Sequence, residues 1–224
     1  QFRQVYELAG TRFSDFGSQP GDERVSEMVH ALDRRALGEA RARFAISQNV
    51  AARLSRYNGL EAEPLYPPPA LGDRYRAEAH GDCVVTVGRL DPMKRFDLLI
   101  RAVAAASTPL RAVIAGDGPD LDRLRALAAE LGVAARVELP GRVGDERLLE
   151  LYARALAVFY APFDEDYGYV TVEAFLSKKP VLTCDDSGGP LEFVADGASG
   201  IVTAADPEAL ALGMRRLSDM DGAR

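Results

Sequence analysis

Two acidic and two basic residues in the C-terminal part of the sequence have the types and the spacing of a site for a charged, polar ligand. Glu165 and Glu173 lie eight residues apart, in a segment that passes from a turn into an expected helix. Arg89 and Lys94 follow an apolar strand pattern and precede another helix. Cations bind phosphate oxygens strongly, and carboxylates accept hydrogen bonds from hydroxyl groups. The four residues therefore predict a nucleotide-sugar site, with cations for the diphosphate and carboxylates for the hydroxyls.

Both pairs also have plain structural explanations. The two cations could be solvated loop residues that pair with Asp91 or Asp97, and a glutamate near a helix start is often only a cap or a partner of the helix dipole. Glu173, however, lies within an otherwise apolar stretch, residues 170–176. A carboxylate that is buried there needs a partner, because an unpaired buried charge is very costly. A ribose diol would be one such partner.

Length and composition indicate a folded protein. The chain has 224 residues, of which 47% are hydrophobic, so it can bury at least one full core. Its formal charge is -7. Residues 1–80 are balanced in charge, so the excess of acid lies C-terminal to them. Lys and Arg supply most of the non-specific affinity for nucleic acid, and an acidic domain without a basic stripe is a poor duplex binder. We expect no nucleic-acid partner.

The cysteines and the hydropathy pattern favour a reducing compartment. Cys83 and Cys184 each lie in an apolar, strand-like run, so we expect two reduced, buried thiols. No run approaches the ~20 apolar residues of a membrane-spanning helix, and no basic-then-apolar signal opens the chain. We therefore expect a cytoplasmic protein. Because the first residue is Gln1, we also expect that an upstream segment is missing.

From about residue 81, strand and helix patterns alternate. This alternation predicts an α/β fold with a Rossmann-like parallel sheet and helices on both faces. The expected strands are 83–87, 111–115, 136–139, 156–160, 180–184 and 200–203. Ligands of such sheets bind beyond the carboxyl ends of the strands, and the residues singled out above follow these ends.

Residues 1 to about 70 have a different, mainly helical pattern. Long helical patterns at 25–43 and 49–57 accompany only short strand candidates, 44–46 and 64–66. This is too little sheet for an independent domain. Ser47 is a plausible cap for the second helix, and three consecutive prolines then form a stiff connector. We expect residues 1–70 to be the tail of a preceding domain with its linker, and residues 71–224 to form the ligand-binding domain.

Residues 116–119, Gly-Asp-Gly-Pro, follow a strand and open a helix, as a dinucleotide fingerprint would. Glu138 stands where such a fingerprint places its acidic residue, so a nicotinamide-dependent dehydrogenase is a second hypothesis. Leu121 replaces the third glycine, which weakens it. Pro119 suits the first helical position and Asp117 the cap region, so a structural turn explains the segment better.

Histidine contributes no evident site. His30 falls in a helical pattern and His80 in the linker, and we expect both on the surface. The sequence shows no Ser/His/Asp or Cys/His arrangement and no metal-ligand spacing, so no metal site is expected.

From about residue 42 onward, the sequence resembles the retaining glycosyltransferases of the GT-B fold, in the large family 4 (group 1). Each motif alone is weak, but their order, each at the end of a strand, is specific. The motifs that carry the resemblance are Gly88-Arg89-Leu90 with Lys94, Ala115-Gly116-Asp117-Gly118-Pro119, Leu139-Pro140-Gly141-Arg142-Val143, the spaced pair Glu165 and Glu173, and Gly188-Gly189-Pro190.

The resemblance implies a role for each matching residue. Arg89 and Lys94 would bind the donor diphosphate, and Glu165 would bind the hydroxyls of the sugar. These three residues would form the catalytic set, while Glu173 would bind the ribose hydroxyls. The remaining donor-binding positions would be Gly116, Val143 with Asp145 near the base, and the backbone of Gly168, Tyr169 and Val170 beneath the phosphates.

The implied reaction is transfer of a sugar from a nucleoside-diphosphate sugar to an acceptor hydroxyl with retained anomeric configuration. It would need no cofactor beyond the donor and no metal. The acceptor would be a glycan, a glycolipid or a small molecule, which leaves peripheral contact with the inner membrane face open, through the missing domain. Most of the acceptor domain is absent, so we expect this chain to be inactive alone. Arg95 stands where the family often has Gly, and we expect it to affect only loop geometry.

Two further hypotheses remain open at this stage. A non-catalytic nucleotide-sugar sensor would share the donor site, and an epimerase on the same fold would release a free, altered sugar instead of a glycoside.

Overall fold

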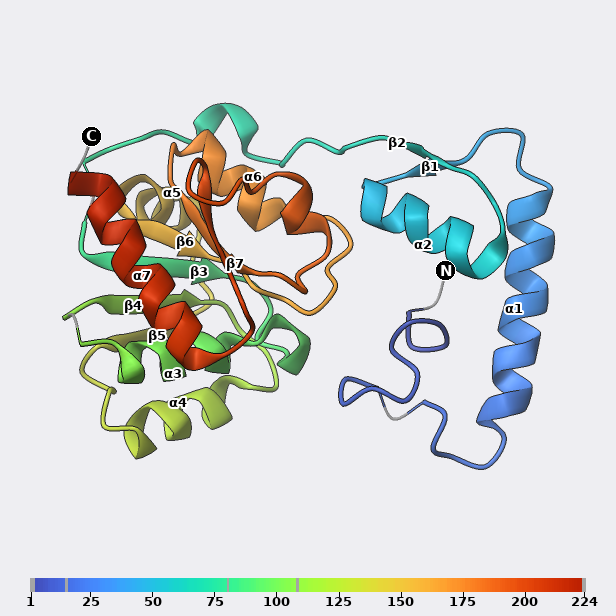
Figure 1. Cartoon of the computed structure of the whole chain (residues 1–224), viewed down its shortest axis with the longest axis horizontal. Helices are drawn as coiled ribbons and strands as arrows, with labels where there is room; N and C mark the ends of the chain where they lie inside the picture. The colour runs from blue at the N-terminus through green and yellow to red at the C-terminus, as the bar shows by residue number, and fades with distance from the viewer. Residues whose placement is uncertain (1–2, 15, 80, 108, 223–224) are drawn as a thin grey trace. The chain divides into compact units, whose positions relative to one another are not determined.

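The computed structural model describes residues 3–14, 16–79, 81–107 and 109–222. The chain forms two compact units, Gln1–Pro67 and Pro68–Arg224 (Figure 1). The division falls within the run of prolines, where the sequence predicts a stiff connector.

A six-stranded parallel sheet forms the centre of the C-terminal unit, in the order β5-β4-β3-β6-β7-β8. The predicted α/β fold is therefore confirmed. Three strands (β3, β4 and β8) have the predicted bounds, and the ends of the other three differ by one or two residues, with β6 shortened at both ends. The strands are β3 (Cys83–Val87), β4 (Arg111–Ala115), β5 (Val137–Gly141), β6 (Ala157–Phe159), β7 (Val181–Cys184) and β8 (Gly200–Thr203).

Helices cover both faces of this sheet. On one face, α3 (Phe96–Ala105), α4 (Leu121–Glu130) and α7 (Pro207–Gly222) enclose a core with fully buried Leu99 and Ile114. Figure 1 shows α7 crossing in front of the strands, with α3 and α4 below them in the view. On the other face, α5 (Asp145–Arg154) and α6 (Tyr169–Leu176) share a second core with the strands. Each fully buried Leu or Ile side chain contributes about 1.5–3 kcal/mol.

The order of the strands reverses beside β3. The chain first adds β4 and β5 on one side of β3, and then crosses to place β6, β7 and β8 on the other. β3 is parallel to both neighbours, with Val85 paired to Val113 of β4 and to Val158 of β6. Such a reversal opens a crevice at the carboxyl ends of the strands. The loops after β3, β4, β5 and β6 therefore meet at this edge.

Two glycines let the loop after β4 pack against the loop after β3. A Cβ at Gly116 would lie 1.8 Å from the Gly88 carbonyl oxygen, and one at Gly118 would lie 2.4 Å from the Leu90 carbonyl oxygen. Leu90 is hydrogen bonded through its backbone to Asp117 and Asp120. These bonds hold residues 117–120 in a turn, so the helix α4 begins later in the sequence than predicted. α4 begins at Leu121 after the N-cap residue Asp120, so the predicted roles of Pro119 as first helical residue and of Asp117 as cap are wrong.

The N-terminal unit is mainly helical, as predicted. Ser47 caps the second helix by accepting a 3.0 Å hydrogen bond from the Val50 amide, which confirms the predicted cap. The first helix ends earlier than predicted because the Arg43 side chain donates to the carbonyls of Leu37 and Ala40. The elements are α1 (Asp22–Gly38), β1 (Phe44–Ala45), α2 (Gln48–Asn58) and β2 (Glu63–Pro64), and β1 pairs with β2 in parallel.

Large apolar side chains lie exposed on this unit. α1 has no buried residue, and Met28 and Leu32 are 64% and 65% exposed beside a hollow of about 560 Å³. On the two-stranded sheet, Phe44 is 60% exposed, and Leu65 just after β2 is 61% exposed. Exposed apolar patches of this kind often mark a surface that interacts with another protein segment, a ligand or a membrane.

The close approach at Gly116 predicts a large loss of stability on substitution. Gly116→Ala should lower the free energy of unfolding by about 3 kcal/mol or more, because the new Cβ must displace backbone. Gly132→Ala is the matched control, since Gly132 also has a positive φ but its Cβ would meet no atom within 4 Å. The control should cost about 1 kcal/mol. Urea unfolding of both variants measures the difference, and equal losses would contradict the packing argument.

Candidate functional site

A cavity of about 320 Å³ opens at the carboxyl ends of β3, β4 and β5. Three of the sequence-predicted donor residues, Arg89, Gly116 and Val143, line it. Its full lining is Val87, Gly88, Arg89, Ala115, Gly116, Asp117, Arg142, Val143 and Leu148. The walls combine exposed backbone at two glycines, two guanidinium groups and an apolar patch. A phosphate group and a flat apolar ring could be accommodated together in such a cavity.

Arg89 directly follows Gly88, the first residue after β3. Gly88 continues the sheet by donating to the Ala115 carbonyl at 3.0 Å, and the exposed Arg89 follows it at the cavity wall. A guanidinium in this position presents several donors to an anion in the cavity.

Lys94 and Glu165 form an ion pair, although they are far apart in sequence. Lys94 lies in the 3₁₀ turn Pro92–Lys94 after β3, and Glu165 lies in the loop after the neighbouring strand β6. Tyr160 joins the pair, since its hydroxyl donates to Glu165 Oε2 at 2.9 Å and accepts from Lys94 Nζ at 3.3 Å. The alternative partners expected from sequence are engaged elsewhere. Asp91 accepts from the Met93 amide, and Asp97 lies beside Arg123.

The environment of Glu165 keeps it ionised. Burial alone would raise the pKa of this carboxyl, but the Lys94 charge and the hydrogen bonds from Lys94 and Tyr160 lower the pKa below its usual value. Burial and the Glu165 charge raise the pKa of Tyr160 well above normal, so its hydroxyl stays a donor. The Glu165 backbone is also fixed, because its amide donates to Ser187 and its carbonyl accepts from Gly189.

Glu173 lies in α6 and binds a different tyrosine. It is half-buried, and its Oε2 accepts a 2.7 Å hydrogen bond from the hydroxyl of the fully buried Tyr152 in α5. Tyr75 packs edge-on against the Tyr152 ring, with 5.5 Å between centroids. The chain itself thus supplies the partner that burial of Glu173 demands. Burial and the Glu173 charge raise the pKa of Tyr75 well above its usual value, so the Tyr75 hydroxyl also lies beside this carboxylate.

The start of α6 brings backbone close to this cluster. Gly168 has a left-handed conformation with φ 88°, and no described side chain caps the helix that begins at Tyr169. A Cβ at Gly168 would lie 2.9 Å from the Tyr160 ring and 3.0 Å from Pro190. Val170 is buried and Tyr169 is 43% exposed. Amide groups at such a helix start can bind phosphate oxygens.

Asp145 is not among the residues that line the cavity. It is the first residue of α5, its side chain is 65% exposed, and it lies 3.7 Å from Arg74. Of this pair, Val143 lines the cavity and Asp145 does not.

Arg95 binds the loops that follow two other strands, which the sequence did not indicate. Its side chain is buried, and the guanidinium binds the Asp186 carboxylate through two hydrogen bonds of 2.6 and 2.7 Å. Sequence alone could not indicate this role, because Asp186 lies after a different strand, β7.

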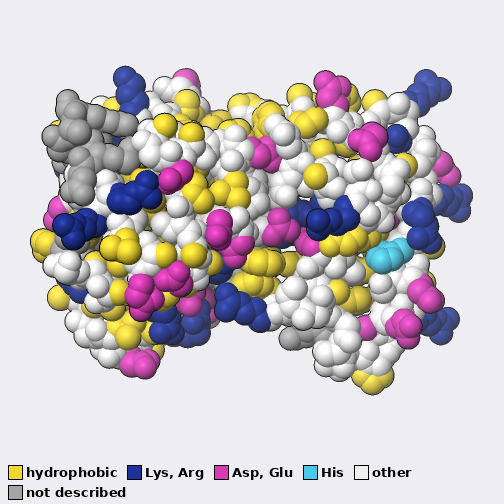
Figure 2. Space-filling model, viewed as in Figure 1, with side chains coloured by type: hydrophobic (Ala, Val, Ile, Leu, Met, Phe, Trp, Pro, Cys, Tyr) yellow, Lys and Arg dark blue, Asp and Glu magenta, His cyan; other side chains and the backbone are white. Residues whose placement is uncertain are grey.

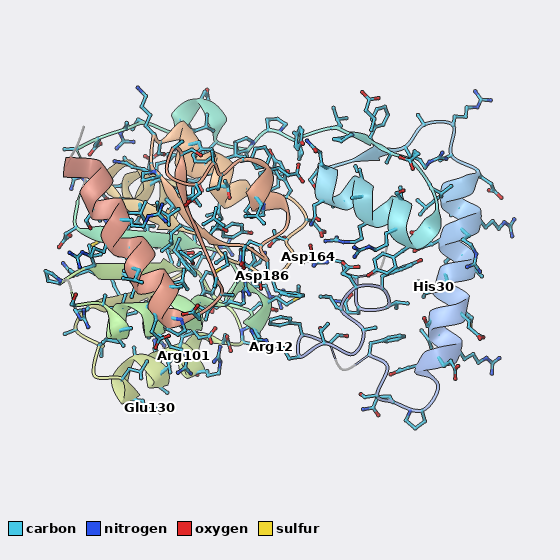
Figure 3. All side chains as sticks on the ribbon, viewed as in Figure 1. Arg12, His30, Arg101, Glu130, Asp164 and Asp186 are labelled. Carbon is cyan, nitrogen blue, oxygen red and sulfur yellow. The ribbon has the colours of Figure 1, made fainter. Side chains whose placement is uncertain are left out.

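Histidine and cysteine differ from their predictions in detail. His30 of α1 (Figure 3) is half-buried, with its ring stacked on Tyr6 at 4.4 Å between centroids, so it is less exposed than predicted. His80 lies outside the described residues. Cys184 is buried as predicted, whereas Cys83 is only half-buried. Burial raises the pKa of Cys83 to about 11 and that of Cys184 to about 12, so both thiols are protonated at neutral pH.

Sequence reasoning did not assign several residues that the structure brings to the site. Arg142 and Leu148 line the cavity, and Tyr152 and Tyr160 bind the two glutamates. A signal existed for Arg142, since it directly precedes Val143 after β5. No sequence signal marked Tyr152 and Tyr160 as site residues, because both follow the apolar pattern of core positions.

Charge and hydropathy add two observations on the described part of the chain. On the face drawn in Figure 2, Lys and Arg side chains are interspersed with Asp and Glu. Among the described residues, no helix is long and apolar enough to cross a membrane, and no group of three His, Cys, Asp or Glu residues could hold a metal ion.

Residues 75–224 match the family model described as glycosyl transferases group 1. The chain belongs to this family. A D-inositol 3-phosphate glycosyltransferase of Nocardia farcinica is 34% identical over 222 residues, which cover 88% of this chain and 49% of the relative. An exopolysaccharide phosphotransferase of Streptomyces coelicolor is 36% identical over 151 residues, 65% of this chain and 16% of the relative. The chain spans no more than half the length of these curated relatives.

Solved glycosyltransferases share the fold. Anabaena HepE in complex with UDP-glucose superposes with a TM-score of 0.76 at 24% identity, over 90% of this chain and 58% of that one. A sucrose-phosphate synthase of Thermosynechococcus elongatus also gives 0.76, at 23% identity, over 88% of this chain and 53% of the other. The C-terminal unit thus has the α/β fold of these GT-B glycosyltransferases.

Family membership overturns the dehydrogenase hypothesis, and the geometry explains why. Glu138 lies near the beginning of β5 and lines a second cavity, together with residues at the start of β3 and β4. Gly116 lies at the opposite end of the strands. The acid and the glycine do not share one site.

Proposed function

We propose that this glycosyltransferase chain binds a nucleoside-diphosphate sugar, whose hexosyl group the enzyme transfers to an acceptor hydroxyl with retention of configuration. The observation that carries the proposal is the cavity lined by Gly88, Arg89, Gly116 and Val143. It opens where the strand order reverses, which is the usual ligand position in such sheets. The Lys94–Glu165 pair lies on the loops of the adjacent strands β3 and β6.

The diphosphate is assigned to the cations and to exposed backbone. Gly88 and Gly116 have no side chain to keep a phosphate away, and Arg89 supplies a guanidinium at the wall. The uncapped start of α6 offers further amide donors. Val143 and Leu148 give an apolar surface that suits a base.

Lys94 is assigned to the departing diphosphate. Its ammonium has three N–H donors, of which two face Glu165 and Tyr160, and the third is assigned to a phosphate oxygen. Negative charge grows on the diphosphate as the anomeric bond breaks. A fixed cation aimed at that charge stabilises the transition state more than the ground state.

The two glutamates are assigned to different parts of the donor. Glu165 accepts from hydroxyls of the transferred sugar, and Glu173, which Tyr152 orients, accepts from hydroxyls of the ribose. For retention, the acceptor oxygen bonds to the anomeric carbon on the face from which the diphosphate leaves. The acceptor proton passes to a diphosphate oxygen. This scheme needs no protein nucleophile, no cofactor and no metal ion.

We further propose that residues 1–67 are the tail of the acceptor domain. The exposed apolar side chains of α1, with Phe44 and Leu65 beside the small sheet, support this assignment. A two-stranded sheet is marginal alone and is stabilised when further strands extend it. Acceptor choice among glycans, glycolipids and small molecules would lie in that domain. We place the reaction in the cytoplasm, or at the inner membrane face if the acceptor is lipid-linked.

Binding to this chain tests the donor site directly. Arg89→Ala should weaken binding of UDP or GDP by about 10- to 100-fold, because a charge-assisted hydrogen bond contributes about 1.5–3 kcal/mol. Titration calorimetry measures the affinities. Arg101→Ala is the control, since Arg101 is an exposed residue of α3 outside the cavity lining (Figure 3). Equal affinities of the two variants would remove Arg89 from the site.

Transfer by a form of the protein that carries the acceptor domain tests the reaction. Lys94→Ala should slow transfer by about 100-fold or more, the scale for one preorganised donor, and Lys94→Arg should recover part of the loss. NMR of the anomeric proton in the product should show the configuration of the donor. An inverted product contradicts retention, a free altered sugar indicates an epimerase, and donor binding without any product indicates a sensor.

Hydrogen exchange tests the assignment of the N-terminal unit. In a protein with the acceptor domain, the amides of α1 should exchange at least about 10-fold more slowly than in this chain, because packing suppresses local opening. The amides of α3 serve as an internal control and should change little. Unchanged exchange in α1 would show that its apolar face has no partner there.

A further inference from the structure

Arg95 joins three loops at the carboxyl edge of the sheet. It follows the turn that carries Lys94, and its side chain is only 3% exposed. Its Nε donates to the Ala161 carbonyl at 2.7 Å, and Nη2 donates to the Pro162 carbonyl at 3.0 Å. Both carbonyls lie in the loop after β6. The fork of the guanidinium binds both carboxylate oxygens of Asp186, in the loop after β7.

The backbone of Arg95 is in a conformation that disfavours any side chain. Its φ of 53° and ψ of 38° are left-handed, which brings a Cβ too close to the carbonyl oxygen. Glycine would adopt this conformation freely. The strain persists only because the surrounding contacts of the side chain offset it. The contacts made by the guanidinium therefore have a structural purpose that glycine could not serve.

The loops that Arg95 joins are the ones that hold Lys94 and Glu165. Backbone hydrogen bonds extend the connection, with the Phe163 amide donating to Met93 and the Asp164 amide donating to Asp186, both at 2.9 Å. Asp164 and Asp186 are labelled in Figure 3, in loops at this end of the sheet. Only Phe163 and Asp164 lie between Pro162 and Glu165 in the chain, so the guanidinium contacts of Arg95, which we call the clamp, leave the Glu165 backbone little freedom.

We propose that Arg95 is a positioning residue for the donor site: by binding Ala161, Pro162 and Asp186, it holds the Lys94 loop against the Glu165 loop and so fixes the Lys94–Glu165 pair. Lys94 and Glu165 have long, partly exposed side chains, with 26% and 16% exposure. Such side chains meet in one geometry only when their backbones are held in register. That this positioning also strengthens diphosphate binding rests on the proposed function.

Titration of Glu165 measures the clamp without any ligand. In this chain, the carboxyl carbon of Glu165 can be followed by NMR with labelled glutamate and assigned with Glu165→Gln. The folded chain should show a Glu165 pKa below the usual value, because the Lys94 charge and hydrogen bonds from Lys94 and Tyr160 outweigh burial. Arg95→Gly keeps the left-handed backbone and removes the guanidinium contacts of the clamp, together with their positive charge. Release of Lys94 should then raise the Glu165 pKa by about one unit.

Two variants separate positioning from a direct effect of charge. Arg95→Lys keeps the positive charge but cannot make the forked contact with Asp186, so the clamp predicts a raised Glu165 pKa and a charge effect predicts no change. Asp186→Asn removes a negative charge, which acting through space would lower the Glu165 pKa. If the clamp acts by positioning, Asp186→Asn should raise it instead. The two mechanisms thus predict opposite signs.

The outcomes decide the proposal in each case. A Glu165 pKa unchanged from wild type in Arg95→Gly, with a folded spectrum, overturns it, as does a lowered value in Asp186→Asn. Should Arg95→Gly fail to fold, Arg95→Lys and Asp186→Asn decide by the signs given above. UDP binding is measured in parallel, and Arg95→Gly should weaken it by about 10-fold. If the wild-type chain binds no nucleoside diphosphate, the proposed function fails while the titration still decides the clamp.

Discussion

The parallel pairing of β3 with β6 is the constraint on which the site depends. These strands are distant in sequence, but they are neighbours that run in the same direction, so the loops at their carboxyl ends must meet. Lys94 enters from the loop after β3 and Glu165 from the loop after β6. A crossover that placed β6 elsewhere in the sheet would leave each charge without the other. The cores on the two faces matter for function chiefly because they hold these strands in register.

Eight residues separate the two glutamates, and a helix start lies between them. Glu165 precedes α6 and binds Tyr160, whereas Glu173 lies inside α6 and binds Tyr152. Each acid therefore has its own phenol, and each keeps an oriented carboxylate before any ligand arrives. A preorganised pair of this kind reduces the entropy that a flexible donor must lose on binding. The spacing serves to deliver two differently supported acids to one edge of the sheet.

Much of the fold was predictable, because the spacing of apolar residues within each segment indicates whether that segment forms a strand or a helix. Interactions between distant segments were not. Arg95 appeared as a minor departure from a glycine, since sequence shows neither its left-handed backbone nor Asp186 after β7. His30 appeared exposed because its partner Tyr6 belongs to an irregular segment. The position of α4 was missed for the same reason, as Leu90 holds the preceding turn.

Tyr160 contributes to the site in two unrelated ways. Its hydroxyl orients Glu165, while one edge of its ring fills the space that a side chain at Gly168 would need. Tyr160→Ala would therefore remove the hydrogen bond to Glu165 and also leave a cavity beside the start of α6. An alanine scan could not separate these two effects. Phenylalanine deletes only the oxygen. For a residue that both orients an acid and fills space, substitution by Phe is therefore more informative than substitution by Ala.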